Sequence, residues 1–174
     1  MQLGDVRYAV LPVWNSTIGR IVPAWEALAQ PDDDSPLSVR AVGEITIPIR
    51  HYLLCRPGVR PESITGVMGH PAALGQCERM IADRRLRPLP AEDSAGAARA
   101  LAAATDGATM RVPGSDAVVD PRVTATIAPV AAAARYHLAV VACAVQDQPD
   151  NRTSFLVVEA GAGVTESRRT LHDA

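Results

Sequence analysis

Lysine is absent from this chain, and all 17 of its basic residues are arginine. With the abundant alanine, this bias is typical of GC-rich coding and indicates no function by itself. The formal net charge is only −2, and the arginines form no stripe or polybasic run. The composition therefore points to neither a nucleic acid nor a membrane surface as a partner.

A secretion signal and a membrane-spanning run are also missing. The first seven residues, Met-Gln-Leu-Gly-Asp-Val-Arg, lack the charged-then-apolar order of a signal peptide. No apolar stretch is long enough to cross a bilayer. We therefore expect a protein of the cytoplasm.

Cysteine is scarce, and the three residues Cys55, Cys77 and Cys143 lie far apart in apolar or helical surroundings. Buried free thiols are the expected state of all three. The sequence contains no C-x-x-C or H-x-x-x-H pair, so we expect no metal site. No motif points to a cofactor either.

The chain does contain enough apolar residues, 48% of 174, to bury a real core as one domain or two small lobes. Expected strands alternate with expected helices along the sequence. The strands are predicted at Tyr8–Val13, Val39–Ile49, His51–Cys55, Ile64–Met68, Thr124–Ile127, Leu138–Cys143 and Phe155–Glu159. This alternation predicts an α/β fold with a mainly parallel sheet. The Gly- and Pro-rich stretch from Thr105 to Arg122 is expected to be a long loop or a small flap.

Two polar segments adjoin these strands. Asn15-Ser16-Thr17 follows the first strand and offers N-cap residues for an amphipathic helix that runs to about Ala29. A polar turn from Gln146 to Arg152 leads into the last strand, with hydroxyls at Thr153 and Ser154. Strand ends in open α/β sheets are where ligand crevices form, so this junction is a candidate binding site.

Five segments occur in an order that is found in one enzyme family. They are Tyr8–Thr17 (YAVLPVWNST), Gly43–Leu54 (GEITIPIRHYLL), Gly69–Cys77 (GHPAALGQC), Thr126–Leu138 (TIAP…YHL) and Gln146–Val158 (QDQPDNRTSFLVV). They resemble the segments VVPIENST, GEI…PIRHNLL, SHPQALAQC, AIAS…YGL and Q-D-x-x-x-N-x-T-R-F-L-V of prephenate dehydratases. Because the five matches are collinear, the chain is identified as a member of that family.

The resemblance implies a two-lobed fold similar to periplasmic binding proteins, with the active site in the cleft between the lobes. It also implies a role in phenylalanine and aromatic amino acid biosynthesis. Members convert prephenate to phenylpyruvate, and the substrate loses carbon dioxide and its ring hydroxyl. Such a site needs a donor for the departing hydroxyl and donors or positive charge for two carboxylates.

By resemblance, Thr153 supplies the hydroxyl that assists the leaving group. Asn15, Ser16 and Thr17 bind an anion at the lobe crossing, and Phe155 packs behind the site. The remaining substrate-binding candidates are Ser154, Gln146 and His51.

Simpler interpretations stay open. Asn15-Ser16-Thr17 is also a good ordinary helix cap, and Thr153 is also a plain strand residue. His51 is also a plausible structural histidine, and Gln146 a cap of the crossover between lobes.

The sequence departs from the family pattern in ways that bear on the substrate. Ser154 replaces the Arg of T-R-F, which removes a positive charge and a bidentate donor. Trp14 replaces the Glu of E-N-S and adds a large aromatic surface. Gly69 replaces the Ser of S-H-P, a smaller loss.

The expected organisation is one prephenate dehydratase-like domain over residues 1–160, with a flexible tail at 161–174. Lobe two is expected at about 16–144. Lobe one is expected to be a stump of two strands, 6–13 and 153–160, because family members carry a further portion with a G-P-x-G-T-F motif before the first strand. Two strands are not stable alone and their edges invite pairing, so we expect a homo-oligomer. A shortened gene or a partner subunit that supplies the missing half is the alternative.

The resemblance therefore implies a carbon–oxygen lyase acting on prephenate or a related cyclohexadienyl carboxylic acid. The alternative is a non-catalytic small-acid-binding or inactive relative that serves as a subunit or scaffold.

Overall fold

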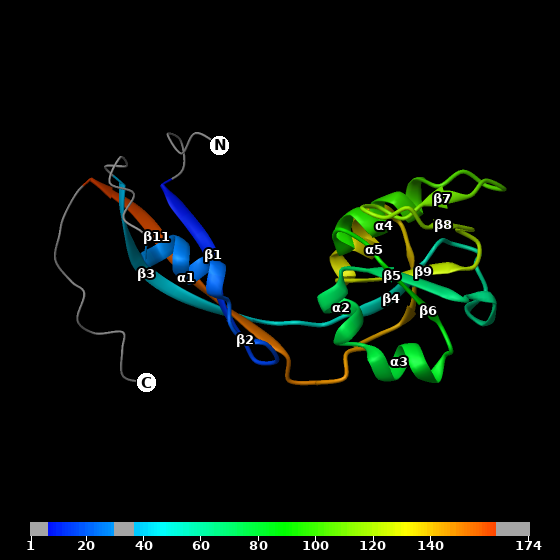
Figure 1. The fold of residues 1–174 in the computed structure, drawn as a ribbon, viewed down its shortest axis with the longest axis horizontal. Helices are drawn as coiled ribbons and strands as arrows, with labels where there is room; N and C mark the ends of the chain where they lie inside the picture. Colours follow the sequence, from blue (N-terminus) through cyan, green and yellow to red (C-terminus); the bar gives the residue numbers. More distant parts are fainter. Residues whose placement is uncertain (1–6, 30–36, 163–174) are drawn as a thin grey trace. The chain divides into compact units, whose positions relative to one another are not determined.

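The computed structural model describes residues 7–29 and 37–162, which form two compact units. The first unit combines residues 1–48 with 151–174, and the second is the continuous segment 49–150 (Figure 1). The boundaries differ from the expected 16 and 144 because the long strand after the first helix pairs with the last strand of the chain. The expected lobe-one stump of two strands is therefore a larger unit. Residues 163–174, most of the expected tail, lie outside the described part.

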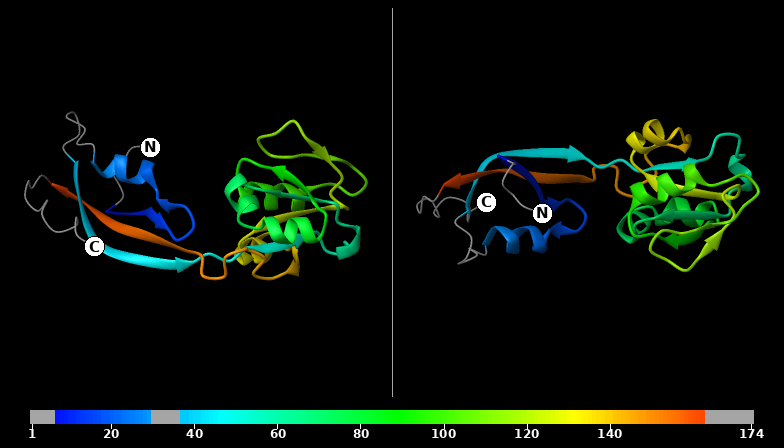
Figure 2. Two further views of the ribbon diagram at one scale, coloured as in Figure 1. Left: turned by 60° about the horizontal axis from the view of Figure 1, so that its bottom comes forward. Right: turned by 90° about the horizontal axis from the view of Figure 1, so that it is seen from above.

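In its described residues, the first unit is an antiparallel sheet with one helix. Its strand order is β2-β1-β11-β3, and the central strand β11 pairs with β3 along its whole length. Helix α1 lies beside β1, where the Trp25 indole N–H donates to the Val13 carbonyl at 2.9 Å (Figure 2). The elements are β1 (Tyr8–Asn15), β2 (Gly19–Arg20), α1 (Val22–Ala29), β3 (Leu37–Pro48) and β11 (Arg152–Ala162).

The expected helix directly after Asn15-Ser16-Thr17 is wrong. The strand β1 continues to Asn15, and a turn then sends the chain back as β2, which pairs with Trp14 and Asn15. Gly19 has a φ of +76°, a conformation that glycine adopts at little cost and that lets the turn close. The helix begins only at Val22, so Asn15 is a turn residue and not a helix cap.

The second unit contains a five-stranded mixed sheet of order β10-β4-β9-β5-β6. Strand β5 runs parallel to β6 and β9, whereas β4 runs antiparallel to β9 and β10. Its strands are β4 (Tyr52–Cys55), β5 (Gly66–Gly69), β6 (Arg87–Pro90), β9 (Thr124–Ala128) and β10 (Ala139–Ala142).

The α/β class is confirmed, but the expected mainly parallel sheet is wrong. Parallel neighbours need a crossover, and helices supply one between β5 and β6 and one between β6 and β9. The strands by which the chain enters and leaves the unit, β4 and β10, join antiparallel. Periodicity in the sequence reveals the crossover helices but not the direction of the outer strands.

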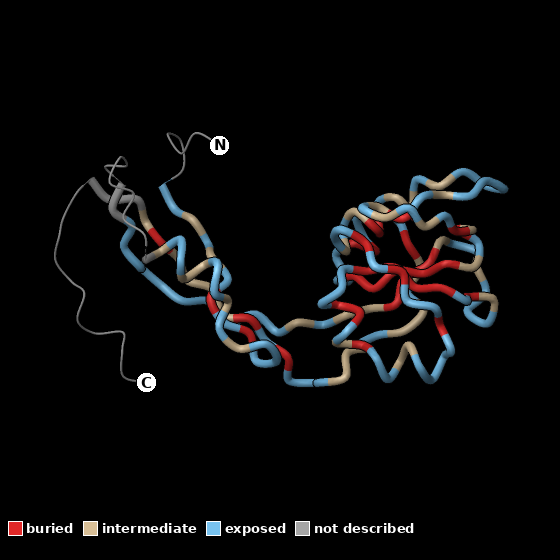
Figure 3. Tube along the Cα trace, viewed as in Figure 1, coloured by how far each residue is buried: buried red, intermediate tan, exposed pale blue. Residues whose placement is uncertain are grey.

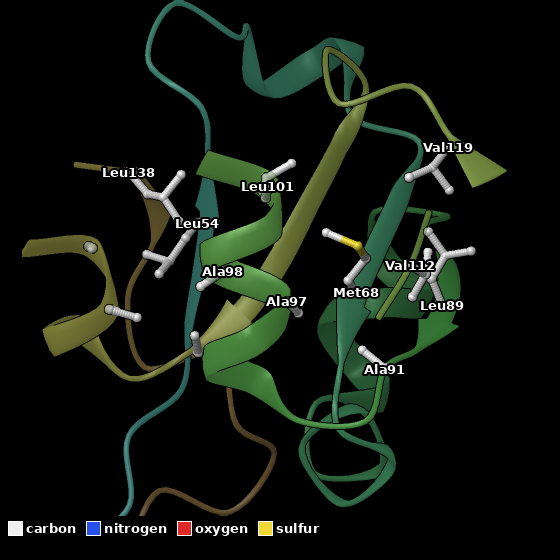
Figure 4. Close-up of a cluster of buried hydrophobic side chains, with 13 residues drawn as sticks. Leu54, Met68, Leu89, Ala91, Ala97, Ala98, Leu101, Val112, Val119 and Leu138 are labelled. Carbon is white, nitrogen blue, oxygen red and sulfur yellow. The ribbon is translucent and has the colours of Figure 1, made fainter. Parts of the chain in front are cut away.

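Helices cover both faces of the second unit's sheet. Helices α4 (Ser94–Ala103) and α5 (Val130–Tyr136) lie on one side, and α2 (Pro71–Gly75) and α3 (Glu78–Asp83) on the other (Figure 1). Leu54 and Met68 pack with Leu101 in one core cluster (Figure 4). Their chain neighbours Leu53 and Val67 pack in a second cluster. Adjacent strand residues therefore feed opposite cores, and buried positions gather in this sheet (Figure 3).

The stretch from Thr105 to Arg122 is partly ordered as a hairpin and is not a loop throughout. Strands β7 (Met110–Arg111) and β8 (Val118–Val119) pair antiparallel. Val112, which is fully buried, and Val119 anchor the hairpin in the core cluster of Leu101. This segment is therefore better described as a hairpin packed on the core than as a flap.

The cysteines differ in accessibility, which corrects the expectation of three buried thiols. Cys55 and Cys77 are buried and Cys143 is exposed. Burial, together with the charge of Asp147, raises the pKa of the Cys77 thiol to about 12, and burial also raises the pKa of Cys55. Two of the three thiols are therefore poor nucleophiles in the folded protein.

We accordingly expect one fast thiol in the native protein. With an aromatic disulfide reagent at mildly alkaline pH, Cys143 should react at once, and Cys55 and Cys77 only on unfolding. A Cys143→Ser variant should lose the fast phase completely. A second fast thiol in that variant would contradict the buried positions of the other two.

Candidate active site

Asn15 and Thr153 form the buried polar centre of the first unit. They are register partners at the end of β1 and the start of β11, so their side chains share one face of the sheet. They are only 5% and 7% exposed. The Asn15 amide Nδ2 shares its two hydrogens among three acceptors, Thr153 Oγ1 at 2.9 Å, Asn151 Oδ1 at 3.0 Å and the Arg152 carbonyl at 3.1 Å.

The orientation of the Asn15 amide is fixed by the turn that follows it. Its Oδ1 accepts from the backbone N–H groups of Thr17 and Ile18 at 2.9 and 3.2 Å. The amide nitrogen must therefore face Thr153, whose oxygen acts as an acceptor. Among the described residues, none accepts a hydrogen bond from the Thr153 hydroxyl, so its own hydrogen remains available to a ligand.

Ser16 fastens the turn to β11. Its Oγ accepts from the Arg152 N–H at 2.9 Å and donates to Asn151 Oδ1 at 3.3 Å, while its own N–H donates to the Arg152 carbonyl at 2.9 Å. Thr17 is exposed at the tip of the same turn. The structure thus brings Asn15 and Ser16 to Thr153 and places Thr17 beside them.

The Ser154 side chain lies on the opposite face of the sheet from that of Thr153, because side chains alternate along a strand. Its Oγ lies 2.9 Å from Thr46 Oγ1, and its register partners are Trp14 and Thr46. Phe155, two residues after Thr153, shares the face of Thr153. The two positions that depart from the family motifs, Trp14 and Ser154, therefore face each other across the strands and lie away from the Thr153 hydroxyl.

His51 and Gln146 belong to the second unit, where they form a separate polar cluster with Gln76. The Gln146 side-chain oxygen accepts from the His51 N–H at 3.0 Å, and His51 Nε2 lies 2.8 Å from Gln76 Oε1. An amide oxygen only accepts, so Nε2 carries the ring hydrogen. His51 Nδ1 is buried and has no partner within residues 7–29 and 37–162. Sequence reasoning missed Gln76, although it lies in the matched segment Gly69–Cys77.

Asp147, next to Gln146, caps helix α3 from a distant part of the sequence. Its carboxylate accepts from the N–H groups of Glu78 and Arg79 at 2.9 and 3.2 Å. Its own N–H donates to the Gln76 carbonyl at 2.7 Å, and the Arg79 guanidinium donates to its carbonyl. Gln146 and Asp147 therefore hold the segment after β10 against His51 and against the start of α3.

Removing this cap is expected to loosen the start of α3. Asp147→Ala deletes the acceptor of two backbone N–H groups and should cost about 1 kcal/mol. It also removes a charge that raises the pKa of Cys77. In a Cys143→Ser background, labelling of Cys77 should accelerate. Arg79→Ala keeps the carboxylate cap and should change the labelling rate much less; equal rates for the two variants would contradict this role of Asp147.

A metal centre has no support in the described residues, where no group of three or more His, Cys, Asp or Glu side chains could hold an ion. In the same part of the chain, none of the helices has the length and apolar character needed to cross a membrane.

Comparison with known proteins identifies the family. The sequence profile described as "Prephenate dehydratase" matches residues 1–162. Arogenate dehydratase 1 of Petunia hybrida is 36% identical over 152 residues, which are 86% of this chain and 31% of that protein. Prephenate dehydratase of Mycolicibacterium gilvum (strain PYR-GCK) is 28% identical over 160 residues, 91% of this chain and 45% of that protein. This chain belongs to the prephenate dehydratase family, as its five collinear segments predicted.

Solved structures share the fold. The prephenate dehydratase from Arthrobacter aurescens in complex with L-Phe matches with a TM-score of 0.70 and 24% identity, over 94% of this chain and 48% of that one. GqqA, described as a novel type of quorum quenching acylase, also matches with a TM-score of 0.70, at 23% identity and over 52% of its length. The chain thus spans about half the length of these structures, and less than half of the two sequence relatives above.

Proposed function

We propose that this chain supplies catalytic machinery of a carbon–oxygen lyase that acts on prephenate or a related cyclohexadienyl carboxylic acid. From prephenate the product is an aromatic keto acid, made for phenylalanine biosynthesis or a specialised relative of it. The observation that carries the proposal is the Asn15–Thr153 hydrogen bond, which fixes the Thr153 oxygen and leaves its hydrogen available. Family membership supports dehydratase chemistry in general.

The reaction asks for a donor at the ring hydroxyl. As the ring carboxylate departs as carbon dioxide, the electron pair of its C–C bond enters the ring. The C–O bond then breaks, and the hydroxide that leaves takes up a proton to become water. The Thr153 hydroxyl is a weak acid, so its contribution is a positioned hydrogen bond to the departing oxygen. The hydrogen bond that it accepts from Asn15 polarises it and makes it a stronger donor.

The substrate's carboxylates require further donors. In the second unit, His51 and Gln146 are the candidates for such donors, with Gln76 holding the His51 ring. The Gln146 side-chain oxygen accepts from the His51 backbone N–H. The amide nitrogen of Gln146 is then the group that can donate to a carboxylate. Thr17, Ser16 and the turn at Asn15 are the corresponding candidates in the first unit, and Phe155 contributes apolar surface on the face of Thr153.

The departures at Trp14 and Ser154 are compatible with activity. In the family motifs these positions carry Glu and Arg, and here they are cross-strand partners on the face away from Thr153. Exchanging both removes one positive and one negative charge from the same place, so no unpaired charge remains. The loss of Arg is therefore balanced locally and leaves the Asn15–Thr153 pair intact.

The test is turnover of the two acids that name the relatives. The purified 174-residue chain is incubated with prephenate, and separately with arogenate, at neutral pH, with a protein-free control. We expect the aromatic product from at least one of them. Binding by calorimetry without product would favour the alternative of a non-catalytic acid-binding relative. If the chain binds neither acid and forms no product, the proposal is overturned for this chain.

A further inference from the structure

A cation and two indole rings gather at one end of the first unit's sheet, on the face opposite Thr153. The Arg20 guanidinium lies over the Trp25 ring, 4.6 Å from its centroid. Arg20 is also the register partner of Trp14, so their side chains lie on the same face of neighbouring strands. We call Arg20, Trp14 and Trp25 the indole–guanidinium cluster. Both tryptophans of the chain belong to it.

The cluster is held in place by the fold of the unit. The Trp25 indole N–H donates to the Val13 carbonyl at 2.9 Å, which fixes the ring of helix α1 against strand β1. The turn after Asn15 brings β2 back beside β1 and so carries Arg20 to that ring. The attraction between a guanidinium and an indole ring positions the cation without using its N–H donors. The donors of Arg20 are therefore positioned before any ligand arrives.

Arg20 has no carboxylate partner within residues 7–29 and 37–162. The ion pairs of those residues engage other arginines, such as Arg7 and Arg40, which both pair with Glu159. Glu44 lies on the same face as Arg20 but on β3, at the opposite edge of the sheet from β2. Arg20 is also exposed. The cluster thus offers a guanidinium fork, the side chain best suited to a carboxylate, to a ligand from solution.

Trp14 supplies an aromatic surface beside this cation. It is 41% exposed, although it is one of the largest apolar residues in the unit. On its other side the next two register positions carry the short side chains of Ser154 and Thr46, whose hydroxyl oxygens lie 2.9 Å apart. One exposed tryptophan indicates little by itself. Next to an arginine without a carboxylate, it provides the second half of a binding site.

The departures of this chain from the family motifs lie in the same row of the sheet. The motifs carry Glu and Arg where this chain carries Trp14 and Ser154. A glutamate at position 14 would lie beside Arg20 and compete for its donors. The tryptophan leaves those donors to a ligand and adds a ring face. The two exchanges therefore convert a row of charged side chains into an aromatic surface beside one cation.

We propose that the indole–guanidinium cluster binds an aromatic carboxylate. The carboxylate accepts hydrogen bonds from Arg20, and the aromatic ring of the ligand packs on the Trp14 indole. An aliphatic acid lacks the ring contact, and an aromatic amine meets a like charge. The cluster lies on the other face of the sheet from Thr153, so this binding is separate from the proposed reaction.

The experiment is an NMR titration of the full ¹⁵N-labelled chain with phenylacetate. The two indole N–H signals are followed, and the one absent from Trp14→Leu belongs to Trp14. We expect the Trp14 signal to shift and saturate with a Kd of about 1 to 10 mM, as for a small ligand at an open site. Cyclohexylacetate has the same charge without the ring face and should bind at least about threefold more weakly. Phenethylamine, which carries the opposite charge, should shift neither signal.

Single substitutions identify the groups that bind. Arg20→Gln should weaken phenylacetate binding by about two- to fivefold, the contribution of an exposed ion pair. Arg40→Gln is the matched control, because Arg40 is an arginine of the same unit that pairs with Glu159, and it should leave the Kd unchanged. Thr153→Val should also leave the Kd unchanged. Circular dichroism of each variant checks that the fold is retained.

The outcomes are independent of turnover, since binding is measured without the enzyme's substrate. A saturable shift of the Trp14 signal that Arg20→Gln weakens and Arg40→Gln does not supports the proposal. It is overturned if about 50 mM phenylacetate shifts neither indole signal, if phenylacetate and cyclohexylacetate bind equally, or if the two arginine variants lose affinity equally. A shift that Thr153→Val abolishes overturns it too, because the ligand then lies in the candidate active site.

Discussion

Replacing Thr153 with valine is expected to lower kcat on the accepted substrate by about 10²- to 10⁴-fold, the usual contribution of a positioned proton or hydrogen-bond donor. Valine keeps the branched shape and removes only the hydroxyl. The Asn15 amide retains its other acceptors, Asn151 Oδ1 and the Arg152 carbonyl. The fold should therefore lose only about 1 kcal/mol. Steady-state kinetics with a denaturation curve of the same sample measures both effects.

The sheet provides a matched control for this variant. Thr46 carries the same side chain on the opposite face, where it pairs with the Ser154 hydroxyl. Thr46→Val should keep wild-type turnover, and Thr153→Ser should keep most of it because the donor remains. Equal activity of Thr153→Val and Thr46→Val would remove Thr153 from the mechanism.

Exchanging Asn15 for aspartate is expected to destabilise the first unit by about 3 kcal/mol or more at neutral pH. The side chain then presents only acceptors to Thr153 Oγ1, Asn151 Oδ1 and the Arg152 carbonyl, although the turn to Thr17 stays satisfied. Both tryptophans, Trp14 and Trp25, are in this unit, so denaturation followed by tryptophan fluorescence reports on it directly.

The pH dependence of that loss provides its own control. Burial among acceptor oxygens raises the pKa of the introduced carboxyl above its unfolded value. Its protonated form donates as the amide did, so the stability is present below the unfolded pKa and is lost as pH rises through the folded pKa. The difference from wild type should therefore shrink at acid pH. A difference that is equal at pH 4 and pH 7 would contradict the donor role of Asn15.

Much of the fold followed from local patterns. The β-branched run after Arg152 became β11, and Pro71 and Asp93 mark the starts of α2 and α4. The sequence-based predictions were wrong where the structure depends on the pairing of strands. The sequence predicted a helix cap at Asn15 because Asn and Ser favour helix caps and turns alike. In the structure, Gly19 pairs with Asn15 across a tight turn, so the segment is a turn between two strands. The hairpin after Thr105 has two-residue strands, too short to show a period.

The candidate site was predictable in part. The collinear motifs were enough to select Asn15, Ser16 and Thr153, which the structure brings together. Alternation along a strand would also have separated Ser154 from Thr153. Gln76 and Asp147 were not selected, because their partners His51 and Glu78 are 25 and 69 residues away in the sequence. Such pairs are formed only by the packing of distant segments.

The sequence by itself determined the family, the α/β class and the catalytic candidate, because all three follow from short motifs and from the patterns of individual segments. Tertiary structure decided how the strands pair, and with that which side chains share a face. The shift in β1 between Pro12 and Trp14 sets Asn15 beside Thr153 and Trp14 beside Ser154. Register depends on hydrogen bonds between segments more than a hundred residues apart. One residue of slip would turn every side chain to the other face, which local order cannot prevent.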